Sequence, residues 1–346
     1  MPERVALAFA SRGARVLYCA MPVSRLRRTG EPLREVAASV YRFGPGYLGA
    51  RLSSVPIVGN LQWRVVARQI IAHVRALKLN APVFLYSHVE GMAPLCEEMR
   101  SAGFPLIHLC MDYPEPYQYA LIELSDQTLV IPKSVHHELV AKYGKKIQWI
   151  PQSIHLETPR QGNGTSKEPA QLAAVPRPRL GYLGPIFARL NLPMLREFLT
   201  QNRNWHFVYF GDSKGLELPN AHAISWRSPE ELARFVASFD VGMMPYDCTD
   251  MKNLHCSPLK LYDYFLSGLP VVATPILALS EFKDLIYSGK TSRELTDAVI
   301  RALEEPADSP KRLLRMEVAR AHSTDAQGQR LEEVLKLLET NQGKMQ

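Results

Sequence analysis

The stretch SPLKLYDYFLSGLPVVATP, residues 257–275, decides the architecture of the second half of the chain. Ser257 and Pro258 are typical of the cap and first residue of a helix, and Gly268 is typical of its end. The run LPVVATP that follows is short, apolar and rich in β-branched residues, which predicts a buried strand. A helix that leads directly into a buried strand is half of the repeating unit of a parallel α/β sheet.

Outward from this stretch, predicted strands and helices alternate along most of the chain. In the second half the strands are RLGYLG, HFVYFG, HAISW and VGMMPY, the helices are PMLREFLTQ and PEELARFVASF, and later helices start near Thr291 and Asp325. The first half holds helices VALAFAS, WRVVARQIIAHVRALKL, MAPLCEEMRSAG and SVHHELVAKYG and strands ARVLYCA, PVFLYSH, FPLIHLCM, QTLVIP and KIQWIP. Such alternation predicts parallel sheets with helices on both faces. Residues 22–59, rich in Pro, Gly and Arg, are assigned no element.

A polar stretch with several Pro and Gly residues and no sustained apolar periodicity, over residues 156–178, divides the 346 residues into two α/β series. We predict a first domain over 1–155, a linker over 156–178, a second domain over 179–322 and a C-terminal helix over 323–346. Two such series form two Rossmann-like parallel-sheet domains that face each other across a cleft. The first predicted helix begins directly after Met1, so the first strand of the first domain is expected to be missing.

The net charge of +7 comes entirely from the first half of the sequence. Residues 1–155 hold 18 Lys and Arg against 11 Asp and Glu, whereas the 23 basic and 23 acidic residues after them cancel. A basic half that also carries Tyr47, Leu48 and Trp63 would suit an anionic membrane surface, a lipid phosphate or nucleic acid. A merely solvated basic surface is the alternative.

The five cysteines, Cys19, Cys96, Cys110, Cys248 and Cys256, are odd in number and lie mostly in apolar runs, which favours reduced thiols. The N-terminal residues lack a secretory pattern, and no window is apolar enough over about 20 residues to cross a bilayer. The sequence therefore predicts a cytoplasmic protein, with the inner face of the cell membrane as a place of contact.

The predicted helix after Ser257 is suited to bind an anion. Its first turn offers free backbone N–H groups and the positive end of the helix dipole, and Lys260 adds a point charge one turn in. The carboxylate of Asp263 can accept hydrogen bonds from two ribose hydroxyls. An ordinary amphipathic helix packed on its sheet is the alternative.

From about residue 181 to residue 338 the chain resembles the C-terminal domain of GT-B glycosyltransferases of the family 4 / group 1 type, and in particular their TuaH-like branch. The resemblance rests on GYLGPI, WHFVYFGD, DVGMMPY, SPLKLYDYFLSGLPVVATP and AHSTDAQGQRLEEVL. It implies an α/β protein of GT-B architecture, a nucleotide-diphosphate sugar as donor, and transfer of a hexose or hexuronic acid in cell-surface polysaccharide or glycolipid synthesis. In that family a Glu that binds the donor ribose stands at the position of Asp263.

The sequence departs from the family's pair of glutamates eight positions apart, since Asp263 replaces the second and His255 the first. That first Glu lies beside the transferred sugar, so the sugar and the retaining or inverting outcome stay open. A glycine at the end of the first strand lets a diphosphate approach the backbone, and an arginine supplies a bidentate phosphate contact. The predicted donor-binding residues are Gly184, Arg189, Tyr246, His255, Ser257, Pro258, Leu259, Lys260 and Asp263.

Residues 2–155 resemble the acceptor domain of the same family more weakly. Two polar residues stand at the ends of predicted strands there, His88 in LYSHVEG and Asp112 in HLCMDYPEP. Inversion at a sugar carbon needs a base that takes the acceptor hydroxyl proton, so both are predicted catalytic residues and Asp112 is the favoured base. A strand-end Asp that merely caps a turn is the alternative.

No metal or other cofactor is expected. The Asp, Cys and His residues between positions 247 and 256 match no zinc spacing, and GT-B enzymes neutralise the leaving diphosphate with helix dipoles and basic side chains. The expected partners are a nucleotide-diphosphate sugar, a carbohydrate or lipid-linked acceptor and an anionic membrane, but no nucleic acid. A sugar-nucleotide epimerase of GT-B type and a non-catalytic nucleotide-sugar-binding protein remain alternatives.

Overall fold

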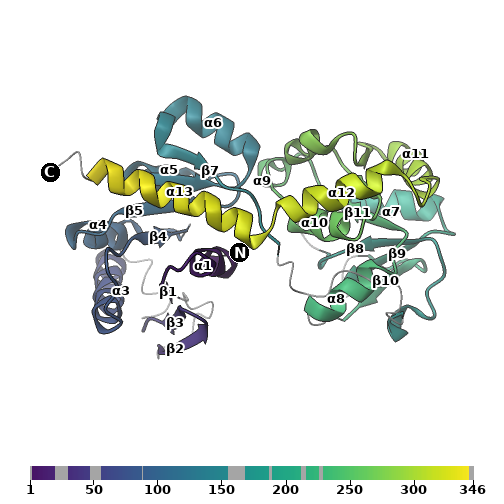
Figure 1. Cartoon of the computed structure of the whole chain (residues 1–346). Coiled ribbons are helices and arrows are strands. Elements are labelled where there is room, and N and C mark those ends of the chain that lie inside the picture. The colour runs from purple at the N-terminus through teal and green to yellow at the C-terminus, as the bar shows by residue number, and fades with distance from the viewer. Residues whose placement is uncertain are drawn as a thin grey trace. The chain divides into compact units, whose positions relative to one another are not determined.

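The computed structural model describes residues 2–19, 30–46, 56–87, 89–154, 168–186, 189–211, 216–225 and 229–342. The chain divides into two compact units (Figure 1), one of residues 1–151 with 324–346 and one of residues 152–323. The second unit is therefore continuous in sequence, whereas the first is completed by the C-terminal helix.

The sheet of the second unit is six-stranded, with every neighbouring pair parallel, in the order β10-β9-β8-β11-β12-β13. Its strands are β8 (Arg179–Tyr182), β9 (His206–Phe210), β10 (Ala221–Ile224), β11 (Val241–Met244), β12 (Val271–Ala273) and β13 (Tyr287–Ser288). This is the Rossmann order, in which the chain direction across the sheet reverses between β8 and β11. The parallel sheet predicted for this half is confirmed.

Helices of the second unit pack on this sheet around one large hydrophobic core. They are α7 (Leu192–Gln201), α8 (Pro229–Val236), α9 (Met251–Leu254), α10 (Leu259–Leu266), α11 (Ser292–Leu303) and α12 (Pro310–Ala321). Two glycines allow close packing: a Cβ on Gly181 would lie 2.0 Å from the Phe239 ring, and one on Gly242 would lie 2.7 Å from the Tyr264 ring. Helices α9 and α12 were not predicted.

The first unit holds a four-stranded parallel sheet in the order β4-β5-β6-β7 and a separate three-stranded sheet in the order β1-β3-β2. The strands are β1 (Val16–Cys19), β2 (Glu31–Ala37), β3 (Val40–Gly44), β4 (Phe84–Tyr86), β5 (Leu106–Cys110), β6 (Gln127–Val130) and β7 (Ile147–Trp149). The purely parallel arrangement predicted here is wrong for β2, which pairs antiparallel with β3.

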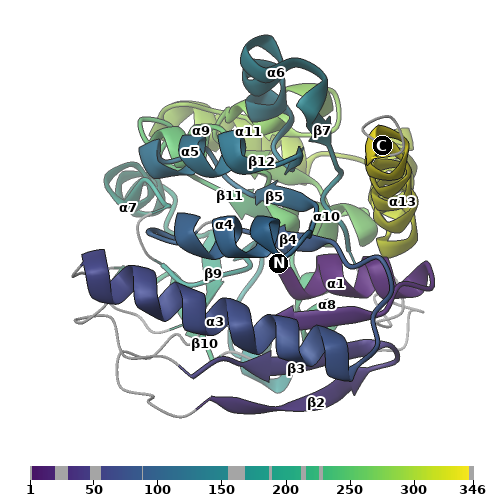
Figure 2. The same ribbon diagram turned by 90° about the vertical axis from the view of Figure 1, so that its left-hand side faces the viewer.

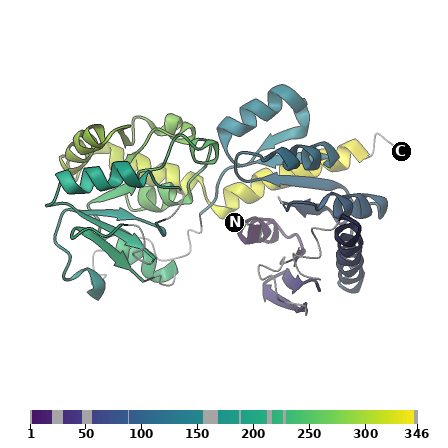
Figure 3. The ribbon, with the colours of Figure 1, turned by 180° about the vertical axis from the view of Figure 1, so that it is seen from behind.

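Among the described residues, the helices that accompany these sheets are α1 (Pro2–Ser11), α3 (Pro56–Ala76), α4 (Ala93–Ser101), α5 (Pro116–Leu124) and α6 (Lys133–Tyr143). The C-terminal helix α13 (Thr324–Gln342), drawn in yellow, runs along the first unit beside α1 (Figures 1 and 3). The two helices approach closely because position 328 is glycine: a Cβ there would lie 2.8 Å from the backbone oxygen of Ala8. Arg12 adds an ion pair to Glu332 at 2.9 Å.

Candidate donor site in the second unit

The helix α10 begins one residue later than its sequence predicts. Pro258 occupies the N-cap position and Leu259 is the first helical residue, so Ser257 lies outside the helix and does not cap it. The other end is as predicted, because Gly268 takes a positive φ of 68°. Its N–H bonds to the carbonyl of Phe265 and the N–H of Leu269 bonds to that of Tyr264, which is a Schellman C-cap.

Tyr264 fixes α10 to the end of β8. Its buried hydroxyl accepts a hydrogen bond from the backbone N–H of Leu183 at 2.9 Å and donates one to the carbonyl of Gly181 at 2.9 Å. Burial raises the pKa of Tyr264 well above its usual value, so the hydroxyl keeps the proton that it donates. The first turn of α10 is thereby held at the carboxyl edge of the sheet, beside the point where the strand order reverses.

The ammonium group of Lys260 lies in a cage of aromatic rings at that edge. Its Nζ is 3.8 Å from the ring centre of Tyr182, the last residue of β8, and 5.3 Å from that of Tyr246, two residues after β11. A Cβ on Gly184 would lie 3.3 Å from the same Nζ. We call Tyr182, Gly184, Tyr246 and Lys260 the Lys260 cage. The faces of aromatic rings attract a cation, so the cage holds the ammonium without a formal negative charge.

Burial makes Lys260 a weaker base than an exposed lysine. Burial lowers the pKa of Lys260 to about 7, and the charge of Arg189 lowers it further, against opposing effects of Cys256 and Asp263. Burial also raises the pKa of Tyr182 and of Tyr246 well above the usual value, so both phenols stay neutral. Within the described part of the chain no carboxylate forms an ion pair with Lys260. An anion that entered the cage would restore the charge that burial disfavours.

The loops after β8 and β11 are joined to each other beside the cage. The carbonyl of Arg189 accepts hydrogen bonds from the backbone N–H of Asp247 at 2.8 Å and from the side-chain amide of Asn253 at 3.2 Å. Leu190 forms an isolated β-bridge with Tyr246. The site is thus built from loops on both sides of the point where the strand order reverses. Open parallel sheets bind their ligands at this point.

The structure brings several of the predicted donor residues together. Gly184, Tyr246 and Lys260 share the cage, and Arg189 and Asp263 are close enough to Lys260 to affect its charge. His255 is only 2% exposed at the end of α9, so it is a buried residue rather than a loose loop histidine. Ser257 and Pro258 precede the first turn and Leu259 starts it.

The predicted catalytic pair belongs to the first unit. Asp112 follows β5, the second strand of the parallel sheet, and is half-buried. Its backbone carbonyl accepts a hydrogen bond from the thiol of Cys110 at 3.2 Å. His88 lies outside the described residues. The strand-end position predicted for Asp112 is confirmed, whereas its role as a base remains a prediction.

Sequence reasoning missed three residues of the site. Tyr182 and Cys256 adjoin Lys260, and Tyr264 anchors α10, but none of the three stands out in the sequence from other buried residues. An aromatic residue two positions before Gly184, at the end of a predicted strand, was the available signal for Tyr182. In the described ranges, no group of three or more His, Cys, Asp and Glu side chains is placed to hold a metal ion.

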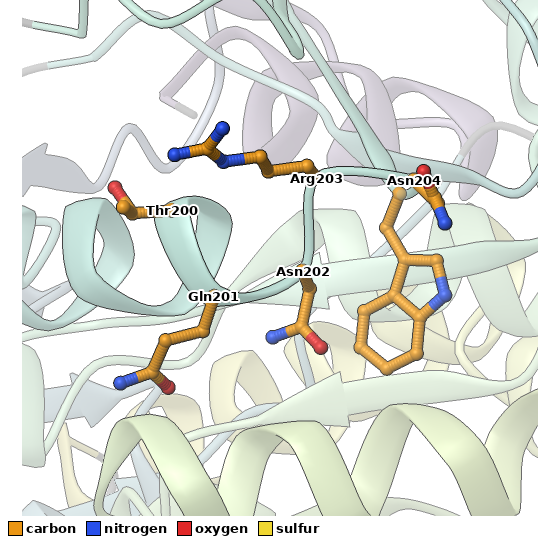
Figure 4. Close-up of a pocket in the computed structure, with 6 residues that line it drawn as sticks. Thr200, Gln201, Asn202, Arg203 and Asn204 are labelled. Carbon is orange, nitrogen blue, oxygen red and sulfur yellow. The ribbon is translucent and has the colours of Figure 1, made fainter.

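The second unit also has a surface hollow, which Figure 4 shows. It is lined by Thr200, Gln201, Asn202, Arg203, Asn204 and Trp205. These residues immediately precede β9, so the hollow lies at the amino edge of the sheet, whereas the cage lies at the carboxyl edge. In Figure 4 the side chains of Gln201 and Asn202 lie on one side of the loop, and that of Arg203 lies on the other.

No family model matches the chain. Among curated proteins, it is 27% identical over 154 residues to TuaH of Bacillus subtilis (strain 168), which is described as a teichuronic acid biosynthesis glycosyltransferase. The match covers 41% of this chain and 38% of that protein, which is well under two thirds of its length.

Solved structures resemble the chain over nearly its whole length. Sucrose-phosphate synthase of Thermosynechococcus elongatus superposes with a TM-score of 0.70 at 12% identity, over 98% of this chain and 93% of that one. The UDP-forming α,α-trehalose-phosphate synthase of Burkholderia vietnamiensis gives 0.69 at 13% identity, over 98% of both chains. A trehalose-6-phosphate enzyme of E. coli, bound with UDP-2-fluoro glucose, gives 0.67 at 12% identity, over 96% and 95%. The chain therefore has the GT-B fold of glycosyltransferases.

Proposed function

We propose that this protein is a glycosyltransferase that moves a hexose or hexuronic acid from a nucleotide-diphosphate sugar to an acceptor in cell-surface polysaccharide or glycolipid synthesis. The GT-B fold and the partial match to TuaH support the reaction class. The observation that carries the proposal is the Lys260 cage, a buried cation without a carboxylate partner among the described residues, placed where a Rossmann sheet binds its ligand.

The donor diphosphate would bind at the first turn of α10. Backbone N–H groups that have no partner within the helix and the positive end of the helix dipole favour an anion there. Lys260 supplies the full positive charge, and the bare backbone at Gly184 allows a phosphate to come close. Such a site neutralises the leaving diphosphate without a metal ion, so the proposal includes no metal and no other cofactor.

Four side chains would orient the rest of the donor. The carboxylate of Asp263 would accept hydrogen bonds from the ribose hydroxyls, and Arg189 would form a forked contact to a phosphate. Tyr246 and His255 would face the sugar. Among the structural neighbours, the E. coli enzyme bound with UDP-2-fluoro glucose shows that this fold accommodates a UDP-sugar.

For an inverting transfer, Asp112 would act as the general base. The acceptor hydroxyl oxygen attacks the anomeric carbon as the bond from that carbon to the β-phosphate oxygen breaks, and Asp112 takes the hydroxyl proton. The electron pair of the broken bond leaves on the diphosphate, whose new charge Lys260 and the α10 dipole stabilise.

An anionic membrane is the proposed place of action, at the cytoplasmic face. The structure contains no helix, within the ranges it describes, that is long and apolar enough to span a bilayer. The helix α3 carries no Asp or Glu, and its outer face combines Leu61, 60% exposed, and Val65, 42% exposed, with Arg64, Arg68 and Arg75. These five positions follow helical spacing, so they share one face of α3, the long helix labelled in Figure 2. Cationic and apolar side chains on one helix face are typical of binding to anionic lipid headgroups.

A donor screen tests the proposed reaction. Thermal shifts with UDP-, GDP- and TDP-sugars should identify one donor that raises the melting temperature, and that donor should release its nucleotide diphosphate only when acceptor extract is present. Release without any acceptor would favour a hydrolase or epimerase. Asp263→Ala should weaken donor binding by about 1–3 kcal/mol through the lost charged hydrogen bonds. Stabilisation by none of the donors would contradict the proposal.

Sedimentation with vesicles tests the membrane contact. Vesicles rich in phosphatidylglycerol should bind the protein at low salt, and Arg68→Glu should weaken binding by roughly fivefold or more. Leu313→Ser is the matched control, because Leu313 is 64% exposed on α12 of the other unit. Equal binding to neutral and anionic vesicles, or an equal effect of the control, would exclude α3 as the binding face.

A further inference from the structure

Gln152 connects the start of the second unit to the candidate donor site. It is the first residue after the chain leaves the first unit, and it is 3% exposed. Its side-chain Nε2 donates a hydrogen bond of 2.9 Å to the carbonyl of Ser257. Ser257 immediately precedes Pro258, the N-cap residue of α10. A single side chain thus fixes the backbone just before the turn that carries Lys260.

A second set of contacts completes a ring around the base of α10. The Ser257 side chain hydrogen-bonds to the hydroxyl of Tyr262, and the Tyr262 ring stacks on His322, with ring centres 4.3 Å apart. The carbonyl of His322 accepts a hydrogen bond from the N–H of Ile154 at 2.8 Å. Residues 152–154 and 322–323 are the two places where the chain enters and leaves the second unit, and both are therefore tied to α10.

This ring holds α10 from the side opposite the Lys260 cage. Residues two positions apart in a helix point about 200° apart, so Tyr262 and Lys260 lie on opposite faces. The contacts agree, because Tyr262 packs on His322 while Lys260 packs on Tyr182. Displacement of the Ser257 carbonyl would shift the first turn of α10 relative to the cage.

The chemistry of Gln152 suggests a role beyond stability. Its Oε1 is buried and accepts no hydrogen bond from any group that the structure describes. A half-satisfied buried amide is costly, so an apolar side chain of similar length would suit the fold nearly as well. The amide is explained instead by the one contact that it makes, to Ser257.

We infer that Gln152 is a positioning residue that holds the first turn of α10 in the geometry needed to bind the donor diphosphate. The inference rests on the proposed function, since it names the residue that orients the proposed donor site from behind. It predicts that donor affinity depends on the Gln152 amide more strongly than stability does.

The test compares Gln152→Met with Gln152→Glu by titration calorimetry, with UDP as the probe. Gln152→Met should weaken UDP binding by roughly tenfold and lower the melting temperature by less than about 4 °C. Gln152→Glu should weaken binding similarly at pH 8, where the carboxylate has no hydrogen to donate to Ser257. The ratio of its dissociation constant to that of the wild type should fall toward one as the pH is lowered to about 5, because burial at this position raises the pKa of the introduced carboxyl and its protonated form can donate.

Hydrogen exchange supplies a readout that a purely structural role would not change. The amides of Lys260 and Leu261 should exchange faster in Gln152→Met than in the wild type, and UDP should protect them less. Gln127→Met is the matched control, because Gln127 in the other unit is 6% exposed and its Oε1 is also buried without a partner among the described groups. That variant should bind UDP normally.

The outcomes separate this inference from the proposed function. Normal UDP affinity in Gln152→Met, together with lost affinity in Lys260→Met, would overturn the positioning role and leave the donor site intact. A loss of affinity only in proportion to lost stability would also overturn it. Absence of binding of UDP, GDP and TDP to the wild type would overturn the proposed function, and the inference with it.

Discussion

The ammonium nitrogen of Lys260 lies 3.8 Å from the centre of the Tyr182 ring, so the first turn of α10 and the end of β8 share one buried cation. The two residues are far apart in sequence and come from opposite sides of the point where the strand order reverses. Their contact places a positive charge at the carboxyl edge of the sheet.

Binding of a nucleotide diphosphate should weaken as the pH rises above 7. Burial lowers the pKa of Lys260 to about 7 in the free protein, and a bound anion favours the charged form. Binding above pH 7 therefore takes up a proton, and affinity falls by up to about tenfold per pH unit until the pKa of the complex is reached. Calorimetry of UDP binding at pH 8, in two buffers of different ionisation enthalpy, measures the uptake. The same heat in both buffers would contradict the role of Lys260.

The folding stability of the free protein should respond to Lys260 in the opposite sense. The unfolded lysine has a pKa of about 10.4, so between pH 7 and that value the unfolded chain binds more protons, and this group makes stability rise with pH. Replacement by methionine removes the cost of burying the charge. Lys260→Met should therefore raise the melting temperature more at pH 6.5 than at pH 9.5. An equal change in melting temperature at both pH values would show that the pKa of Lys260 is not lowered in the folded protein.

Gly184→Ala should impair both stability and donor binding. The backbone there has φ of 157°, which favours glycine, and the added Cβ would lie 3.3 Å from Lys260 Nζ and 3.4 Å from Tyr182 Cε1. We expect a loss of about 1–3 kcal/mol in unfolding free energy and a weaker complex with UDP. Gly144→Ala is the control, since Gly144 also has a positive φ but a Cβ there meets nothing within 4 Å. It should destabilise the protein and leave UDP affinity unchanged.

Asp112→Asn should slow transfer by roughly a hundredfold or more while leaving donor affinity intact, if the transfer inverts. The amide keeps the size of the side chain and cannot take the acceptor proton. Asp126→Asn serves for comparison, because Asp126 accepts a hydrogen bond from the N–H of Leu106 at 2.7 Å. This substitution should lower the stability of the protein and leave the rate of transfer unchanged. Steady-state kinetics with saturating donor distinguish the two, and full activity of Asp112→Asn would remove it as the base.

The second unit was largely predictable because its strands are short, continuous apolar runs bounded by glycine or proline. Each of β8, β9, β11 and β12 was recognised in this way. The sequence did not predict α12, because this helix is largely polar and one of its charged residues is buried. Arg315 is fully buried and pairs with Glu305 at 2.6 Å, and no periodicity of apolar residues reveals such a contact.

The hairpin of β2 and β3 was missed for a different reason. It lies in a stretch rich in Pro, Gly and Arg, and of the seven positions of β2 three are charged and a fourth is proline. Its strands exist because β3 pairs with β1 on one side and β2 on the other, which is a tertiary effect.

Only part of the candidate site could be predicted from the sequence. Lys260, Asp263 and Gly184 were recognisable because helix starts and strand-end glycines have local signatures. Tyr182 and Gln152 were not, because each acts through a contact with α10 from a distant part of the chain. The N-cap predicted at Ser257 is wrong by one residue, because Pro258 takes an extended ψ of 118° and is itself the N-cap.

Titration of UDP into wild-type protein and Lys260→Met at pH 6.5, followed by calorimetry, tests most directly whether the first turn of α10 binds a nucleotide diphosphate. At this pH most of the lysine carries its charge in the free protein. We predict that the methionine variant binds UDP at least about tenfold more weakly, as expected for the loss of a charged contact. Equal affinity of the two proteins would contradict the assignment of this turn as the donor site.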